Sequence, residues 1–303
     1  MQGGIMSTSA KLTHLYETAM SIPFNRASKF ILMSDCHRGD GSWSDNFLKN
    51  QTLFFAALNY YYQRGYTYIE LGDGDELWEN RSMEQIISIH SDAFWLMSRF
   101  YEEGRLYMLY GNHDVVKKNP GFASRTCTSY YCESSRDYIP LFPGVHFPGG
   151  LILDNKEDGY KILLAHGHQG DLLNDTLWPA ARFLVRYFWK HMELIGFQDT
   201  TSAAKNYKKK GRVERRLIKW VESEKHILIA GHTHRPVFPS PGEPPYFNDG
   251  SCVHPRCITG LEIFDGKICL IKWTTLSDEK QGLYVGRELL AGPAELSKYA
   301  GQL

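Results

Sequence analysis

The chain contains five short apolar runs, and each of them leads directly into polar residues that can bind a metal ion. Runs of this length and composition, rich in β-branched, leucine and aromatic residues, are typical of buried strands. No other feature constrains the fold as strongly, because it repeats five times. The runs, each with the polar residues that follow it, are Lys29–Met33 with Asp35 and His37, Tyr66–Leu71 with Asp73 and Glu76, Arg105–Tyr110 with Asn112, His113 and Asp114, Tyr160–Leu164 with His166 and His168, and Lys225–Ile229 with His232 and His234.

Segments with helical periodicity separate the first three runs. Apolar residues recur at helical spacing between Phe47 and Leu58, and again between Met83 and Phe94. A strand, a helix and another strand in this order imply parallel pairing through crossover connections. Active groups of open α/β sheets gather beyond the carboxyl ends of the strands, so we expect the five polar groups to converge in space.

The last part of the chain predicts further strands. Two β-type runs, Gly260–Phe264 and Lys267–Trp273, flank the dipeptide Asp265-Gly266, which is a strong hairpin signal. We expect the sheet to end near Thr275 and residues 288–299 to form a terminal helix.

Composition excludes several classes of protein. The chain has 303 residues, of which 43% are hydrophobic, enough for a packed core, and its 34 basic and 34 acidic residues leave no overall field for nucleic acid or membrane. Residues 1–23 are interrupted by charged side chains, which disfavours a secreted or membrane-spanning protein. The six cysteines form no CxxC pair, so we interpret them as buried thiols of a cytoplasmic protein, although the Cys127/Cys132 and Cys252/Cys257 spacings would also suit zinc half-sites.

The donors at the strand ends are sufficient for two metal ions. Oxygen and nitrogen donors without thiolate suit manganese, iron, zinc, cobalt or nickel better than calcium or magnesium. Asp73 lies in the central group, and a carboxylate can bridge two cations, so we expect it to be the bridge. The seven donors are Asp35, His37, Asp73, Asn112, His166, His232 and His234.

The motifs Asp35-x-His37, Gly72-Asp73-x-x-Glu76, Gly111-Asn112-His113-Asp114, His166-Gly167 and Gly231-His232-x-His234 resemble, in order and complete, those of the calcineurin-like metallophosphoesterase family. The resemblance spans residues 35–234. It implies a four-layer α/β/β/α sandwich with a dinuclear centre at the strand ends, in which manganese is the favoured metal. It further implies one divalent or trivalent ion held by Asp35, His37 and His234, a second held by Asn112, His166 and His232, and Asp73 between them.

By the same resemblance, His113 would reach the scissile phosphate as a general acid or a stabiliser of charge, and Asp114 would orient its imidazole. A neighbouring carboxylate raises the pKa of a histidine and favours the proton-donating form, which fits this role independently. The nucleophile would be a hydroxide that bridges the two metals.

Each residue also has an ordinary structural interpretation. Taken singly, Asp35 could cap a helix and His166 could be a hydrogen-bonded core histidine; taken together, five groups at five strand ends argue against this. Arg38 is a candidate phosphate clamp, with a surface salt bridge as the alternative. His168 is a candidate substrate contact, with a second-shell or plain hydrogen-bonded histidine as the alternative.

The segment 172–224 between the fourth and fifth groups is too long for a simple connection. We expect one domain over residues 1–303 with this segment as an inserted helical cap. A proline at 179 follows a helix-start signal, and residues 205–219 carry eight basic side chains against Glu214 alone. The cap either packs on the sandwich with a solvated charged face or serves as a lid that recognises an anionic substrate and touches a membrane.

These features predict a dinuclear phosphohydrolase that cleaves phosphoester or pyrophosphate bonds of a small or a lipid- or nucleotide-linked substrate. The run Gly231–Pro236 and the helical insertion also resemble UDP-2,3-diacylglucosamine diphosphatases, but that branch has an arginine in place of His113. The alternatives are a serine/threonine-type protein phosphatase, a nuclease of the same fold, and a scaffold without catalytic activity.

Overall fold

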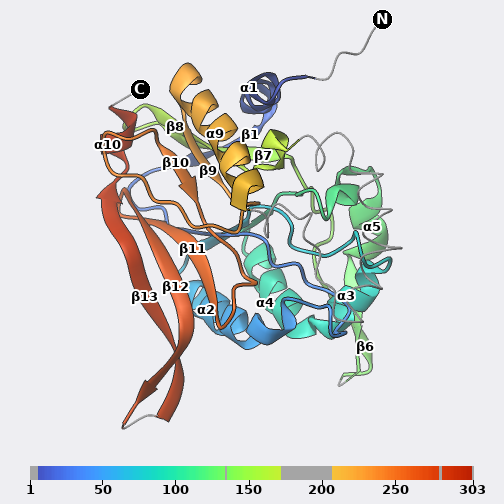
Figure 1. Ribbon diagram of the computed structural model, residues 1–303. Coiled ribbons are helices and arrows are strands. Elements are labelled where there is room, and N and C mark those ends of the chain that lie inside the picture. Colours follow the sequence, from blue (N-terminus) through green and yellow to red (C-terminus); the bar gives the residue numbers. More distant parts are fainter. Residues whose placement is uncertain (1–5, 134, 172–206, 280–281, 302–303) are drawn as a thin grey trace, which may run out of the picture.

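The computed structural model describes residues 6–133, 135–171, 207–279 and 282–301. Within these ranges the strands form a six-stranded sheet of order β13-β12-β11-β2-β3-β4, a five-stranded sheet of order β1-β7-β8-β9-β10, and the small hairpin β5-β6 (Figure 1). Their bounds are β1 (Met20–Phe24), β2 (Phe30–Met33), β3 (Thr67–Glu70), β4 (Leu106–Met108), β5 (Ser129–Cys132), β6 (Asp137–Pro140), β7 (Gly150–Asn155), β8 (Tyr160–Ala165), β9 (Ile227–Ala230), β10 (Tyr246–Asn248), β11 (Cys257–Phe264), β12 (Lys267–Asp278) and β13 (Gly282–Glu295).

The two large sheets pack face to face. Strands with both faces covered carry apolar residues at nearly every position, because successive side chains point to opposite sides. In β2, Phe30 and Leu32 face the space between the sheets, whereas Ile31 and Met33 face the outer side of the six-stranded sheet. The inner layer of the sandwich is therefore built from alternate residues of both sheets.

Helices cover the two outer faces, so the layers are helix, sheet, sheet and helix. The six-stranded sheet is covered by α2, α3 and α4, and the five-stranded sheet by α1 and α9. In α9, Leu217 and Trp220 are completely or almost completely buried in the cluster that α9 and α1 form with the five-stranded sheet. The bounds of the α-helices are α1 (Thr8–Thr18), α2 (Gln51–Gln63), α3 (Met83–Ile89), α4 (Ser91–Glu102), α5 (Phe122–Thr126), α9 (Tyr207–Glu224) and α10 (Ser297–Ala300).

The strand directions bring the functional loops together. The pairs β2–β3, β3–β4 and β8–β9 are all parallel, so within each sheet the carboxyl ends lie at one edge. Three of the polar groups follow strands of one sheet and two follow strands of the other. The site therefore lies where the edges of the two sheets meet.

The predicted fold class, an α/β/β/α sandwich, is confirmed. All five predicted strands are present, as is the hairpin, in which Asp265 and Gly266 both adopt positive φ. The terminal helix predicted for residues 288–299 is wrong: this segment continues β13 to Glu295, where it pairs with β12, and only α10 is helical. Tertiary pairing overrides the local helical preference of residues such as Glu288 and Leu289.

The predicted single domain and its cap over residues 172–224 remain predictions. Residues 172–206 lie outside the described part of the chain, while residues 207–224 form α9. Among the described residues, no helix has the length and apolar character needed to cross a membrane.

Candidate metal centre

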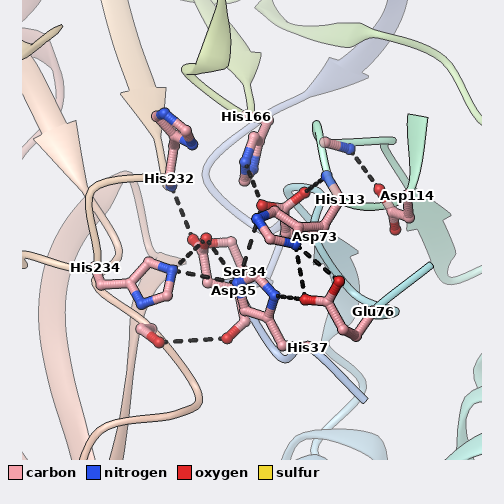
Figure 2. Close-up of polar contacts among 12 residues, drawn as sticks. Ser34, Asp35, His37, Asp73, Glu76, His113, Asp114, His166, His232 and His234 are labelled. Atoms are coloured by element: carbon pink, nitrogen blue, oxygen red, sulfur yellow. Dashed lines mark hydrogen bonds and ion pairs between the residues drawn. The ribbon is translucent and has the colours of Figure 1, made fainter. Parts of the chain in front are cut away.

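All five polar groups converge at the edge of the two sheets (Figure 2). Asp35 and His37 follow β2, Asp73 follows β3, and the remaining donors follow β4, β8 and β9. Each of these residues except His113 and His234 is at least nine-tenths buried. The side chains that the sequence singles out from separate segments therefore form one pocket of donors.

The first group of donors surrounds Asp35. Its Oδ1 lies 2.9 Å from His234 Nε2 and 3.7 Å from His37 Nε2, and the two ring nitrogens are 3.3 Å apart. Ligands held about 2.0–2.2 Å from one metal ion in tetrahedral or octahedral geometry are separated by roughly 3 to 3.5 Å. These three atoms are therefore spaced as donors to one cation.

Asp73 lies between this group and the second one. Its Oδ2 is 3.9 Å from His37 Nε2 and 3.0 Å from His166 Nε2, while its Oδ1 accepts a hydrogen bond from the backbone of His113. His232 supplies a ring nitrogen within 4.8 Å of both Asp73 and His166. One oxygen of Asp73 is fixed by the backbone, and the other faces both groups of imidazoles.

The residues present fit metal ions, because buried donor atoms at this site lack hydrogen-bond partners. Among the described residues, Asp35 Oδ1, Asn112 Oδ1, His166 Nε2 and His232 Nε2 are buried without a hydrogen bond of acceptable geometry. Such groups are costly to bury unless something else satisfies them. The opposite nitrogens of two rings are anchored, because His166 Nδ1 bonds the Leu71 carbonyl and His37 Nδ1 bonds Glu76. This pattern orients metal-binding histidines and leaves their Nε2 lone pairs available.

Five of the candidate ligands adopt a backbone conformation that is rare outside glycine. Their φ angles lie between 49° and 67°, in the left-handed region. Strained residues of this kind cost about 1–3 kcal/mol each and concentrate at functional sites. The turns after β2, β3 and β9 thus direct these side chains towards the centre at a cost in stability. The five residues are Asp35, His37, Asp73, His232 and His234.

Two motif glycines are required by close approach of side chains. A Cβ at Gly111 would lie 2.2 Å from Asp73 Oδ1, and a Cβ at Gly231 would lie 2.1 Å from Ser34 Oγ. Both distances are far below van der Waals contact, so any side chain here would displace groups that position the candidate ligands.

Charge distribution keeps the carboxylates ionised. Burial raises the pKa of Asp35 and of Asp73, but neighbouring histidines, led by His234 for Asp35 and His166 for Asp73, outweigh burial and hold both pKa values below the usual range. Ionised carboxylates are the form that binds cations. Asp35 and Asp73 are therefore in the form that a cation requires.

The partner of His113 differs from the expectation. Its Nδ1 lies 2.7 Å from Glu76 Oε2 and 2.9 Å from Oε1, and its ring stacks on Trp78. Burial lowers the pKa of His113, but the charges of Glu76 and Asp73 outweigh it and raise the pKa above its ordinary value. The His113 and His37 imidazoles, led by His113, outweigh the effect of burial and lower the pKa of Glu76 to about 2.

The expected role of Asp114 is therefore corrected. Its carboxylate accepts hydrogen bonds from the Gly111 backbone and from Lys117, and neither oxygen contacts the His113 imidazole. Asp114 shapes the loop, whereas Glu76 orients the ring. The spacing Gly-Asp-x-x-Glu was visible in the sequence, but nothing local indicated which of two acidic residues would reach the histidine.

Arg38 is also corrected. It is completely buried, its two terminal nitrogens lie 2.8 and 2.9 Å from Glu70, and its Nε lies 2.8 Å from Asp75. Lys117 completes this buried network by bonding Asp75 and Asp114. All three guanidinium nitrogens bond protein carboxylates, and one of them also contacts Met97 Sδ, so Arg38 holds two loops together beneath the site and does not face a substrate.

His168 and two unpredicted residues lie beside the centre. His168 is 5% exposed and its ring centroid is 5.5 Å from that of His166; burial, followed by the His166 charge, lowers its pKa well below the usual range. Ser34 and Asp249 were not among the predicted site residues, and they contact each other next to Asp35. Burial and the charge of Asp35 raise the pKa of Asp249 well above its usual range. All six cysteines are free thiols.

Three comparisons relate the chain to known proteins. Residues 28–236 match the family model described as calcineurin-like phosphoesterase. Among solved structures, Vps29 of Chaetomium thermophilum is similar at 12% identity and a TM-score of 0.40, over 88% of this chain and 97% of that chain. No curated protein sequence matches the chain. Members of the matched family are mostly phosphoester hydrolases that bind two divalent metal ions. Because the match covers more than half of its residues, the chain belongs to the calcineurin-like phosphoesterase family.

Proposed function

We propose that this protein is a metal-dependent phosphohydrolase that holds two transition-metal ions and cleaves phosphoester or pyrophosphate bonds. The observation that carries the proposal is the position of Asp73 Oδ2, which lies within 3.9 Å of His37 Nε2 and 3.0 Å of His166 Nε2. A single carboxylate oxygen between two groups of imidazoles is the arrangement expected of a bridging ligand.

Each cation would have its own donors. Asp35, His37 and His234 would hold one, and Asn112, His166 and His232 would hold the other. Bound together, two such cations would supply Lewis acidity towards a phosphoryl oxygen and would lower the pKa of a coordinated water. The mixed nitrogen and oxygen donors favour manganese, iron, zinc, cobalt or nickel, with manganese as our first choice.

His113 would act on the substrate itself. Glu76 engages its Nδ1, which leaves Nε2 as the ring atom that can carry a proton to the leaving group. Its imidazole is 21% exposed, more than that of any other histidine labelled in Figure 2, so substrate can reach it. The raised pKa favours the protonated form near neutral pH, as a general acid requires.

The substrate that we propose is an anionic ester linked to a lipid or a nucleotide. Arg212, Arg215 and Lys219 are exposed on α9, and α9 packs against the turn that carries His168. A basic surface next to the site would favour anionic substrates, and contact with a lipid surface in the manner of UDP-2,3-diacylglucosamine diphosphatases is one form of this proposal. The presence of all seven candidate ligands argues against a non-catalytic scaffold.

The test is hydrolysis of bis-p-nitrophenyl phosphate and p-nitrophenyl phosphate by metal-stripped protein, with and without Mn²⁺. We expect hydrolysis only with metal and its loss in Asp73→Asn, which keeps the size of the side chain but removes its charge. Activity that survives both chelation and Asp73→Asn would refute the proposal. If both esters fail although two Mn²⁺ ions bind, nucleotide and lipid pyrophosphates follow, and failure of these would favour the scaffold.

A further inference from the structure

A buried carboxyl group beside the metal centre is not one of the candidate ligands. Asp249 directly follows β10 and is completely buried. Its Oδ1 lies 2.7 Å from Ser34 Oγ, and its Oδ2 has no hydrogen-bond partner among the described residues. Burial of a carboxyl group is unfavourable unless the group is satisfied, so its single side-chain contact calls for an explanation.

The contact continues from Ser34 to a candidate ligand. Ser34 Oγ is also 2.5 Å from Asp35 Oδ2 (Figure 2), so one hydroxyl lies between two carboxyl groups. A hydroxyl has one hydrogen to donate. Asp35 must be an anion to hold a cation and can only accept, so the Ser34 hydrogen belongs to Asp35 and the hydrogen in the other contact comes from Asp249. The direction of donation is then Asp249 to Ser34 to Asp35.

We propose that Asp249 is a positioning residue that holds the Ser34 hydroxyl against Asp35 and thereby keeps Asp35 Oδ1 turned towards the metal. This inference rests on the proposed function, in which Asp35 is a ligand. The backbone of His232 donates a second hydrogen bond to the same Oδ2, at 2.8 Å. Two donors fix one oxygen of Asp35 and leave the other for the cation, as outer partners of metal ligands do.

The arrangement also joins the two sheets at the site. Ser34 follows β2 of the six-stranded sheet, and Asp249 follows β10 of the five-stranded sheet. Gly231 makes room for the hydroxyl, because a Cβ there would lie 2.1 Å from Ser34 Oγ. The hydrogen-bond chain therefore fixes Asp35 relative to the loop that carries His232 and His234.

The test is Mn²⁺ binding to metal-stripped protein by calorimetry, with thermal melting as a check on folding. Ser34→Ala and Asp249→Leu should each weaken Mn²⁺ binding by roughly 10- to 100-fold. The double variant should lose no more than the worse single variant, because both substitutions break the same chain. Asp249→Asn should stay close to wild type, because its amide can still donate to Ser34.

Three results would overturn the inference: wild-type affinity in Ser34→Ala or in a folded Asp249→Leu, losses that add in the double variant, or Asp249→Asn as damaging as Asp249→Leu. If Asp249→Leu does not fold, the other two variants decide the matter. Ser34→Ala should then bind Mn²⁺ weakly, and Asp249→Asn should bind it with nearly wild-type affinity. Failure of the proposed function looks different, because the wild-type protein would then either bind no Mn²⁺ or bind it without hydrolysing any ester or pyrophosphate.

Discussion

His113 and Glu76 contact each other at the candidate site, and in the proposed reaction His113 is the general acid that Glu76 orients. His113→Ala should lower kcat by about 10²- to 10⁴-fold, as expected for loss of a general acid, while two metals still bind. Glu76→Gln should also lower kcat, because a neutral amide no longer raises the pKa of the ring. Steady-state kinetics and metal analysis of both variants check this; unchanged kcat in His113→Ala would exclude the assigned role.

Arg38 should contribute to the stability of the fold and not to substrate binding. Arg38→Met removes the charge and leaves Glu70 and Asp75 unpaired in the interior, which should cost roughly 3–5 kcal/mol. The matched control is Arg99→Met, since Arg99 is 45% exposed in its pair with Glu102, and exposed pairs contribute less than about 1 kcal/mol. Urea unfolding measures both. A stable Arg38→Met with a raised KM would instead support a phosphate clamp.

At the scale of elements, the loop after β2 is held by the buried pair of Asp45 and His90, in addition to the Arg38 network. Asp45 accepts hydrogen bonds from the backbones of Gly41, Phe47 and Leu48, and His90, at the start of α4, lies 2.9 Å from it. This joins the loop that carries His37 to the helical layer. The loop is therefore anchored at both ends, by the metal centre and by α4.

Asp45→Asn should show a pH-dependent loss of stability. Burial raises the pKa of Asp45, but its bonds with His90 and the loop backbone outweigh burial and hold the pKa below its ordinary value of 3.8. The ionised form therefore stabilises the fold above pH 3.8, and this contribution disappears as the pH falls through the lowered pKa. At pH 7 the variant should lose about 1–3 kcal/mol, and the difference should shrink at strongly acidic pH. Urea unfolding across this range tests it; a pH-independent difference would contradict the account.

The strands and the candidate ligands differ in how far the sequence predicts them. Strands such as β2 and β9 were predictable because all their residues are buried and apolar, and the ligands because they follow those strands directly. β13 was not, because residues such as Glu288 and Leu289 favour a helix locally and the pairing of β13 with β12 is decided by tertiary contact. The contact between Asp249 and Ser34 was not predictable either, since it depends on how the two sheets pack.

For the whole molecule, α9 is part of the sandwich and not a detachable lid. Leu217 is completely buried against the five-stranded sheet, so Leu217→Ala should cost about 2–5 kcal/mol. Lys219 is exposed on the opposite face, and Lys219→Ala should change stability by no more than about 0.5 kcal/mol. Urea unfolding compares the two. Equal, small effects would mean that α9 is not a structural layer, and a deletion meant to probe the insertion should keep residues 207–224.

The two sheets and their helical layers serve to bring donors from both halves of the sandwich to one edge. The central claim is that these donors form a dinuclear centre that supports hydrolysis. The most direct measurement is a calorimetric count of Mn²⁺ ions bound per metal-stripped chain, with the rate of diester cleavage followed over the same additions. We predict two ions per chain, with activity appearing as the second site fills, and neither full occupancy nor activity in Asp73→Asn. A wild-type chain that binds no Mn²⁺, or Asp73→Asn that binds two ions and remains active, would contradict the account.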